Sequence, residues 1–246
     1  MMTCTTYSCQ VTETKIAGGP KLTKAAVVDR ALQLADAQGL ETLTIRKLAA
    51  ELGVTPMALY WHFRSKEELL AGLVDRVWVE IDVEIDPAAP WPRQLRGLLE
   101  SLLRVLRAHP AASRLLLEFD KQSPSAMRPT EVALEVLRDA GLSPETAANI
   151  VRLALWTGIM LVMSEPGAAF LSAEERAERQ RVKQVALATL PPATFPRVVE
   201  CAVALTACDN PDAHYDFGVT LFIAGVEAIA AREQESTHQA DAARQR

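Results

Sequence analysis

The sequence predicts an all-α protein with a small N-terminal head and a larger helical body. Of its 246 residues, 49% are hydrophobic and only 5% are aromatic. Ala and Leu are prominent and β-branched runs are short, a composition that favours helices over sheets. Apolar residues recur at helical spacing along most of the chain, and Pro or Gly separates the periodic segments.

The first predicted helix follows a polar arm. Residues 1–20 have no sustained apolar period, so we expect a flexible segment there. From about Lys21, an apolar stripe on one helix face precedes Gly39, a residue type suited to a left-handed helix end. The stripe consists of Val27, Ala31, Leu34 and Ala35.

Two short helices joined by a tight turn are predicted next. Thr44 can cap a helix that carries Ile45, Leu48, Ala49 and Leu52 on one side. Gly53 then supplies the turn, and Thr55 and Pro56 are suited to the cap and first position of another helix, which runs to about His62. This pattern predicts a helix-turn-helix.

The exposed side of the third predicted helix is rich in large side chains. Tyr60, Trp61 and His62 lie close to Met57 and Ala58, and only Leu59 and Phe63 are needed for a core. Aromatic groups facing water suit a helix that enters the DNA major groove. The alternative is that Tyr60 and Trp61 pack against the neighbouring domain.

A fourth helix is predicted to connect the head to the body. Ser65 and Glu68 form a capping box that opens a helix through about Ile81, and Lys66 in its first turn can bind a DNA phosphate.

The charges are divided unevenly along the chain. The net charge is −5, yet residues 20–66 hold seven basic and four acidic side chains. From residue 67 onward there are eighteen basic and twenty-six acidic side chains. A basic head on an acidic body fits DNA binding.

The body is predicted as amphipathic helices at 91–109, 111–119, 130–140, 144–164, 173–190, 195–208 and 213–232. The segments 144–164 and 213–232 are apolar around much of their circumference and contain Gly158, Gly218 and Gly225. Two such helices from each chain would form a four-helix dimer interface. The alternative buries them within one monomer.

The sequence also indicates where the protein acts. The N-terminus lacks the pattern of a secretory signal, and the longest uncharged apolar run, 153–164, is shorter than a membrane span of ~20 residues. We therefore expect a cytoplasmic protein. The predicted division is an arm at 1–20, a helix-turn-helix domain at 21–66, a body at 67–232 that begins with a connecting helix at 67–82, and a flexible tail at 233–246.

Residues 43–70, LTIRKLAAELGVTPMALYWHFRSKEELL, resemble the DNA-binding head of the TetR family of repressors. A weaker resemblance, to the tetracycline-repressor branch, continues to about Arg232. It implies an all-helical homodimer that binds an inverted-repeat operator and a small inducer. The predicted DNA-binding residues are Thr44, Arg46, Thr55, Pro56, Met57, Ala58, Tyr60, Trp61, His62 and Lys66. Pro56, Met57 and Ala58 replace polar groups of that branch, so the base preference cannot be copied from it.

The resemblance also defines an expected ligand pocket. Asp82, Leu98 and Leu116 match positions where the tetracycline-binding branch holds a drug–magnesium complex with polar groups. We therefore expect an apolar or aromatic ligand rather than tetracycline–Mg, although ordinary core packing would explain the same residues. The predicted lining is Trp78, Asp82, Leu98, Leu102, Leu116, Phe119, Trp156, Met160 and Met163.

Other functions have less support in the sequence. His109, Ser113, Glu118 and His214 are scattered, no catalytic motif is present, and we expect neither an enzyme nor a cofactor. Two alternatives remain: an interaction module without DNA binding, and a regulator that activates or needs no ligand.

No metal site is expected. Core packing is favoured over a redox role for the pair Cys201 and Cys208, and Cys4 and Cys9 are expected to be free thiols.

Overall fold

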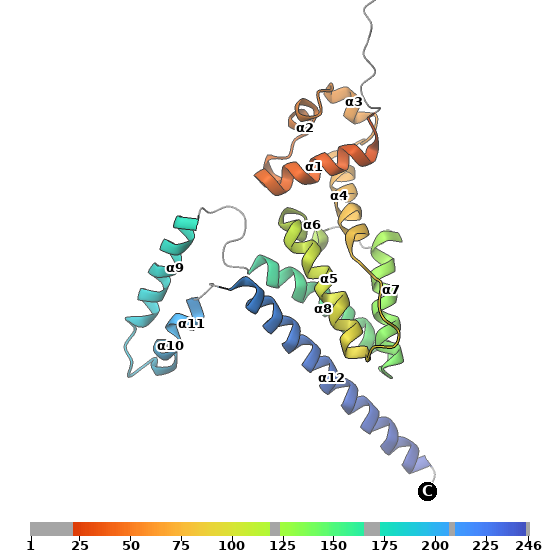
Figure 1. Cartoon of the computed structure of the whole chain (residues 1–246), viewed down its shortest axis with the longest axis vertical. Coiled ribbons are helices and arrows are strands. Elements are labelled where there is room, and N and C mark those ends of the chain that lie inside the picture. The colour runs from red at the N-terminus through yellow and green to blue at the C-terminus, as the bar shows by residue number, and fades with distance from the viewer. Residues whose placement is uncertain (1–21, 119–123, 165–172, 207–209, 245–246) are drawn as a thin grey trace, which may run out of the picture.

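The computed structural model describes residues 22–118, 124–164, 173–206 and 210–244, and every regular element in these ranges is helical. The predicted all-α class is therefore confirmed. Figure 1 shows a head built from the first helices at one end of the molecule and a bundle below it. The predicted arm at 1–20 lies outside the described residues.

The head consists of α1 (Lys24–Gln38), a short 3₁₀ turn (Leu40–Thr42), α2 (Ile45–Glu51) and α3 (Pro56–Tyr60). α1 begins at Thr23, whose Oγ1 accepts a hydrogen bond from the Ala26 N–H at 3.1 Å. It ends at Gly39, where φ is +86° and a side chain would be strained. Its predicted apolar stripe is buried. The predicted end of the first helix at Gly39 is thus confirmed, and the helix begins at Lys24, three residues after Lys21.

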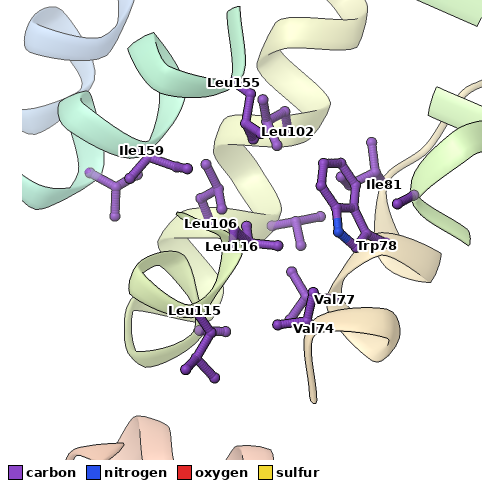
Figure 2. Packing of buried hydrophobic residues seen from close by; sticks show 14 of the residues in the cluster. Val74, Val77, Trp78, Ile81, Leu102, Leu106, Leu115, Leu116, Leu155 and Ile159 are labelled. Carbon is purple, nitrogen blue, oxygen red and sulfur yellow. The ribbon is translucent and has the colours of Figure 1, made fainter. Parts of the chain in front are cut away.

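α4 (Lys66–Glu80) leads from the head into the bundle (Figure 1) and packs against α1 on one side and against α5, α6 and α7 on the other. Figure 2 shows its Val74, Val77 and Trp78 beside leucines of α5 and α6. Buried side chains of the head and of the bundle belong to one continuous apolar cluster. A shift of α4 therefore affects both parts of the chain.

The bundle consists of α5 (Trp91–Ala108), α6 (Pro110–Glu118), α7 (Pro124–Asp139), α8 (Pro144–Met163) and α12 (Pro211–Arg244). α5 packs against each of the other four. Gly158 allows α8 to approach α5 closely, because a Cβ there would lie 3.2 Å from Leu102 Cδ2. The Gly225 Cβ position has no neighbour within 4 Å, so this glycine is not needed for packing within one chain.

A separate group of helices precedes α12. α9 (Ala173–Ala188), α10 (Pro196–Glu200) and α11 (Ala202–Thr206) pack against one another and stand away from the bundle in Figure 1. The predicted helix 195–208 is wrong as a single unit, because the backbone leaves the helical conformation at Cys201. Cys201 is exposed rather than packed in a core, and Cys208 lies outside the described residues.

Two further boundaries differ from the prediction. α7 begins at Pro124 instead of Thr130 and continues through Pro129, whose nitrogen cannot donate a backbone hydrogen bond. α12 continues to Arg244, where a flexible tail was expected from residue 233. Glu233 explains part of this extension, because its Oε2 accepts a hydrogen bond from the Ser143 N–H at 2.8 Å and thereby joins α12 to the start of α8.

Among the described helices, α8 is long and apolar enough to cross a membrane by length and composition alone. A third of its most apolar window is buried, and core helices of soluble proteins can have the same length and composition. The finding is therefore weak evidence for a membrane span.

Candidate DNA interface and ligand pocket

The two caps predicted for the helix-turn-helix are confirmed. Thr44 Oγ1 accepts a hydrogen bond from the Lys47 N–H at 3.2 Å, and Thr55 Oγ1 accepts one from the Ala58 N–H at 3.3 Å. Gly53 has a φ of +65° in the turn between the two helices. Leu59 and Phe63 are buried, so the inner face of α3 is fixed against the head.

The outer face of α3 is unusually apolar for a surface. The Trp61 side chain is 87% exposed, Met57 is 66% exposed and Tyr60 is 48% exposed. Pro56, Thr44 and Arg46 are also exposed, whereas Ala58 and His62 are half-buried. Tyr60 and Trp61 therefore do not pack against a neighbouring domain within the part of the chain that the structure describes. A short helix presents them outward together with Met57.

Three exposed cations lie on the segments that flank α3. Arg46, Arg64 and Lys66 are exposed, and no ion pair joins their side chains to another described residue. The nearby Lys24 and Arg30 differ, because they are paired with Glu68 and Glu51. Arg64 was not among the predicted DNA-binding residues. Its position just ahead of the Ser65 cap, close to Lys66, was the available signal.

The start of α4 is held by a capping box close to the predicted one. Ser65 Oγ accepts a hydrogen bond from the Glu68 N–H at 3.2 Å, and Glu68 Oε2 accepts one from the Arg64 N–H at 2.8 Å. Lys24 Nζ lies 2.8 Å from Glu68 Oε1 and 5.0 Å from the Phe63 ring centroid. The hydrogen bonds from Lys24 and Arg64 keep the pKa of Glu68 below its ordinary value. These contacts fix Arg64 and Lys66 relative to α1.

The bundle contains an apolar cavity of about 330 Å³. The cavity lies between the end of α4 and the helices α5, α7 and α8. Its volume and apolar lining are typical of small-molecule sites. Two of its lining residues are polar or charged, Thr130 and Arg152. The remaining lining residues are Trp78, Ile81, Leu95, Leu98, Leu99, Leu102, Met127, Pro129, Ala133, Leu134, Ala148, Val151, Ala154 and Leu155.

Only part of the predicted pocket lies at this cavity. Trp78, Leu98 and Leu102 line it. Leu116 is buried in the core elsewhere, Asp82 is exposed, and Phe119 lies outside the described residues. The prediction for α8 is wrong: Trp156, Met160 and Met163 are exposed, and the cavity is lined by another face of that helix, which carries Ala148, Val151, Arg152, Ala154 and Leu155.

The contribution of α7 was missed entirely. Met127, Pro129, Thr130, Ala133 and Leu134 line the cavity from this helix. The predicted helix begins at Thr130, which leaves the first two of these residues outside it. Their helical spacing with Ala133 and Leu134 was the signal that could have shown a common face.

The side chains of His109, Ser113 and His214 each make contacts that hold the fold, and no hydrogen bond joins their reactive atoms to one another among the described residues. His109 contacts Asp36 of α1 and Glu80 of α4, whereas His214 Nε2 lies 3.4 Å from the Leu161 carbonyl oxygen of α8. The Ser113 hydroxyl is buried and donates to the Leu106 carbonyl at 3.3 Å. Each of these polar groups is used in holding helices together.

Comparisons with known proteins agree with this architecture. Residues 27–73 match the family model of bacterial regulatory proteins of the tetR family, and residues 86–230 match that of the tetracyclin repressor-like C-terminal domain. The head thus matches the family's N-terminal domain, and the bundle matches the C-terminal domain of tetracyclin repressor-like proteins.

Individual relatives cover most of the chain. The class C tetracycline repressor protein of Escherichia coli is 32% identical over 211 residues, which are 85% of this chain and 92% of the relative. The repressor DrrR1 of Streptomyces coeruleorubidus is 36% identical over 54% of this chain and 50% of its own length. The crystal structure of the Streptomyces coelicolor protein ActR in complex with actinorhodin has a TM-score of 0.75 and 28% identity, and the match covers 86% of this chain and 99% of ActR. The chain belongs to the TetR family of bacterial regulatory proteins.

Proposed function

We propose that the protein is a homodimeric transcriptional repressor that leaves an inverted-repeat operator when an apolar or aromatic small molecule binds its bundle. The outer face of α3, with the exposed cations that flank it, carries this proposal, because a groove-reading helix needs exposed side chains that its own domain does not use. The proposed place of action is the cytoplasm.

Each group on the face has a distinct role in the proposed complex. Met57 and Ala58 contact thymine methyl groups, while the Tyr60 hydroxyl and a His62 ring nitrogen bond base edges or phosphates. Pro56 and Trp61 add apolar contacts with the DNA and contribute to a surface that fits the shape of the groove. Arg46 and Lys66, with Arg64, bind phosphates and supply affinity that does not depend on base sequence. Thr44 and Thr55 lie at helix starts that approach the DNA backbone.

The lining of the bundle cavity supports an apolar or aromatic ligand. Apolar side chains dominate it, and Trp78 supplies an aromatic surface. Leu98 and Leu116 stand where the tetracycline-binding branch holds polar groups, so we keep the proposal that tetracycline–Mg is not the inducer. ActR, a relative of similar fold, was crystallised in complex with actinorhodin.

A dimer is proposed through α8 and α12, in segments 144–164 and 213–232. Apolar side chains on both helices remain exposed in the single chain at positions that share one helix face. They are Leu153, Trp156, Met160 and Met163 on α8, with Phe217 and Leu221 on α12. A dimer would also place two α3 helices about one DNA turn, ~34–36 Å, apart, as two half-sites require.

The switch is proposed to be a population shift. α4 joins the head to the cavity through Trp78, so a ligand that favours one position of α4 also favours one spacing of the two heads. By linkage, operator binding must weaken ligand binding by the same factor. Equal ligand affinity for free and operator-bound protein would contradict this mechanism.

Mobility-shift and footprinting assays on the DNA that flanks its own gene test the proposal. We expect one protected site with two-fold symmetry that outlasts an excess of competitor DNA. Uniform binding to all fragments would overturn the role as a specific regulator. A panel of aromatic compounds, with tetracycline and Mg²⁺ included, then tests release from the footprinted site. A saturable micromolar thermal shift with tetracycline–Mg would refute the proposed ligand class.

A further inference from the structure

One cation lines the apolar cavity of the bundle. Arg152 of α8 is the only charged residue among the described side chains that line it, and no acidic residue is part of that lining. Arg152 is also exposed. In the single chain, a residue that both lines a cavity and reaches solvent lies at the mouth of that cavity, so the guanidinium is available to a ligand without being deeply desolvated.

The protein itself leaves the charge of Arg152 unpaired within the described residues. Its Nη2 donates to Asn149 Oδ1 at 2.6 Å, and this amide is neutral. A guanidinium has five N–H donors in a planar fork that matches an acidic group. Two further side chains of the wall can hydrogen-bond: Trp78 has an indole N–H, and Thr130 already donates its hydroxyl proton to the Ala126 carbonyl at 3.1 Å.

We propose that the cavity selects aromatic or polycyclic molecules that carry one acidic group at one end. The rings lie between Trp78 and the leucines of α5, and the carboxylate, phenolate or sulfonate pairs with Arg152 at the mouth. A charge-assisted hydrogen bond beside an apolar wall is stronger than one in open water, so the acid adds affinity and fixes the orientation. This inference rests on the proposed function and specifies the chemistry of its inducer.

Two fluorescent probes with nearly the same rings test it. 8-Anilinonaphthalene-1-sulfonate carries an acid, and N-phenyl-1-naphthylamine is its neutral counterpart. Both are titrated into the full-length protein and into four variants of it. Arg152→Gln removes the charge, Arg152→Lys keeps it without the fork, and Ala133→Trp fills the cavity. Arg128→Gln, an exposed change on α7, is the matched control for net charge.

We expect the wild type to bind the sulfonate at least about tenfold more tightly than the neutral probe. Arg152→Gln removes this preference by weakening the sulfonate alone, and Arg152→Lys restores part of it. Arg128→Gln leaves both affinities unchanged, and Ala133→Trp weakens both. Circular dichroism verifies that each variant keeps the helical content of the wild type.

The outcomes separate the two proposals. Equal affinity of the wild type for both probes, or a loss of both with Arg152→Gln, would overturn the role of Arg152 while the cavity remains a ligand site. If Ala133→Trp changes neither affinity, or neither probe binds saturably, the cavity is not the binding site. The role of Arg152 and the proposed inducer site then both fail, while operator binding is tested separately by the footprint.

Discussion

His109 Nδ1 lies 2.7 Å from Asp36 Oδ2, although 73 residues separate the two in the sequence. Asp36 belongs to α1 of the head, and His109 follows the end of α5 in the bundle. The other ring nitrogen of His109 lies 3.0 Å from Glu80 Oε2 at the end of α4. Arg76 joins the same group through Glu80 and through Asp29 of α1, each at 2.7 Å. One imidazole therefore connects the head, the connecting helix and the bundle.

This contact predicts a dependence of stability on pH. The hydrogen bond to Asp36 is the main cause that raises the pKa of His109 above its ordinary value, Glu80 adds to it, and burial opposes it. The contribution is fully present below the unfolded-state pKa of ~6.5 and is lost as the pH rises through the higher folded-state value. We expect the free energy of unfolding of the wild type, relative to His109→Gln, to fall across this window. Urea denaturation at a series of pH values measures it.

Because of Asp36, we expect the dependence of the unfolding free energy on pH to be larger than for an ion pair on the surface. Its Oδ1 is buried without a hydrogen-bond partner among the described residues, so a neutral His109 leaves the carboxylate poorly compensated. His214→Gln is the control, because it removes a histidine that lies outside this group. Parallel pH curves for the wild type and His109→Gln would show that the histidine takes no part in the coupling.

The roles proposed on the DNA face predict two different kinds of loss. Lys66→Ala should weaken binding to every sequence and reduce the salt slope by about one, because it removes a phosphate contact. Met57→Ala should cost roughly 1–3 kcal/mol on the true operator and little on unrelated DNA, because it removes contact with bases. Fluorescence anisotropy at several salt concentrations separates the two. A uniform loss with Met57→Ala would mean that this residue does not specify sequence.

Two glycines in the bundle predict opposite effects on stability. Gly97 lies within α5 with no heavy atom within 4 Å of its Cβ position, so Gly97→Ala should raise the free energy of unfolding by about 0.5–1 kcal/mol. Gly158 is wedged against α5, where a Cβ meets Leu102 at 3.2 Å and Leu106 at 3.3 Å. Gly158→Val should lower it by about 1–3 kcal/mol through overpacking. Urea unfolding at one protein concentration compares them, and a gain with both would contradict tight packing of α8 on α5.

The parts that the sequence predicted well are those determined locally. The hydroxyls of Thr44, Thr55 and Ser65 bond backbone groups three residues away, so their sequence neighbours suffice to place the helix starts. The cavity depends instead on which face each helix turns toward its neighbours. Trp156 and Leu155 are adjacent in sequence, yet one is exposed and the other is buried at the cavity. The rotation of α8 about its own axis decides which of these side chains is buried. It is set by the packing of α8 on α5, which the local sequence pattern does not predict.

The exposed apolar side chains of α12 give the last prediction. Phe217 is 70% exposed and Leu221 is one helical turn away on the same face. In a two-fold interface a single substitution acts twice, so Phe217→Glu would bring two desolvated carboxylates into the contact region. We expect the variant to sediment as a monomer at micromolar concentration while its far-ultraviolet circular dichroism remains helical. Because two linked heads bind more tightly than one, its operator affinity should fall much more than its binding of a single half-site.

A matched substitution on another surface separates loss of the interface from a general effect of added charge. Val79 of α4 is a similarly exposed apolar residue, 63% exposed, outside the proposed interface. Val79→Glu adds the same charge and should remain a dimer with unchanged operator affinity. If Phe217→Glu also sediments as a dimer, α12 does not form the interface through this face. The two heads would then have to be linked elsewhere, with the group α9 to α11 as the next surface to change.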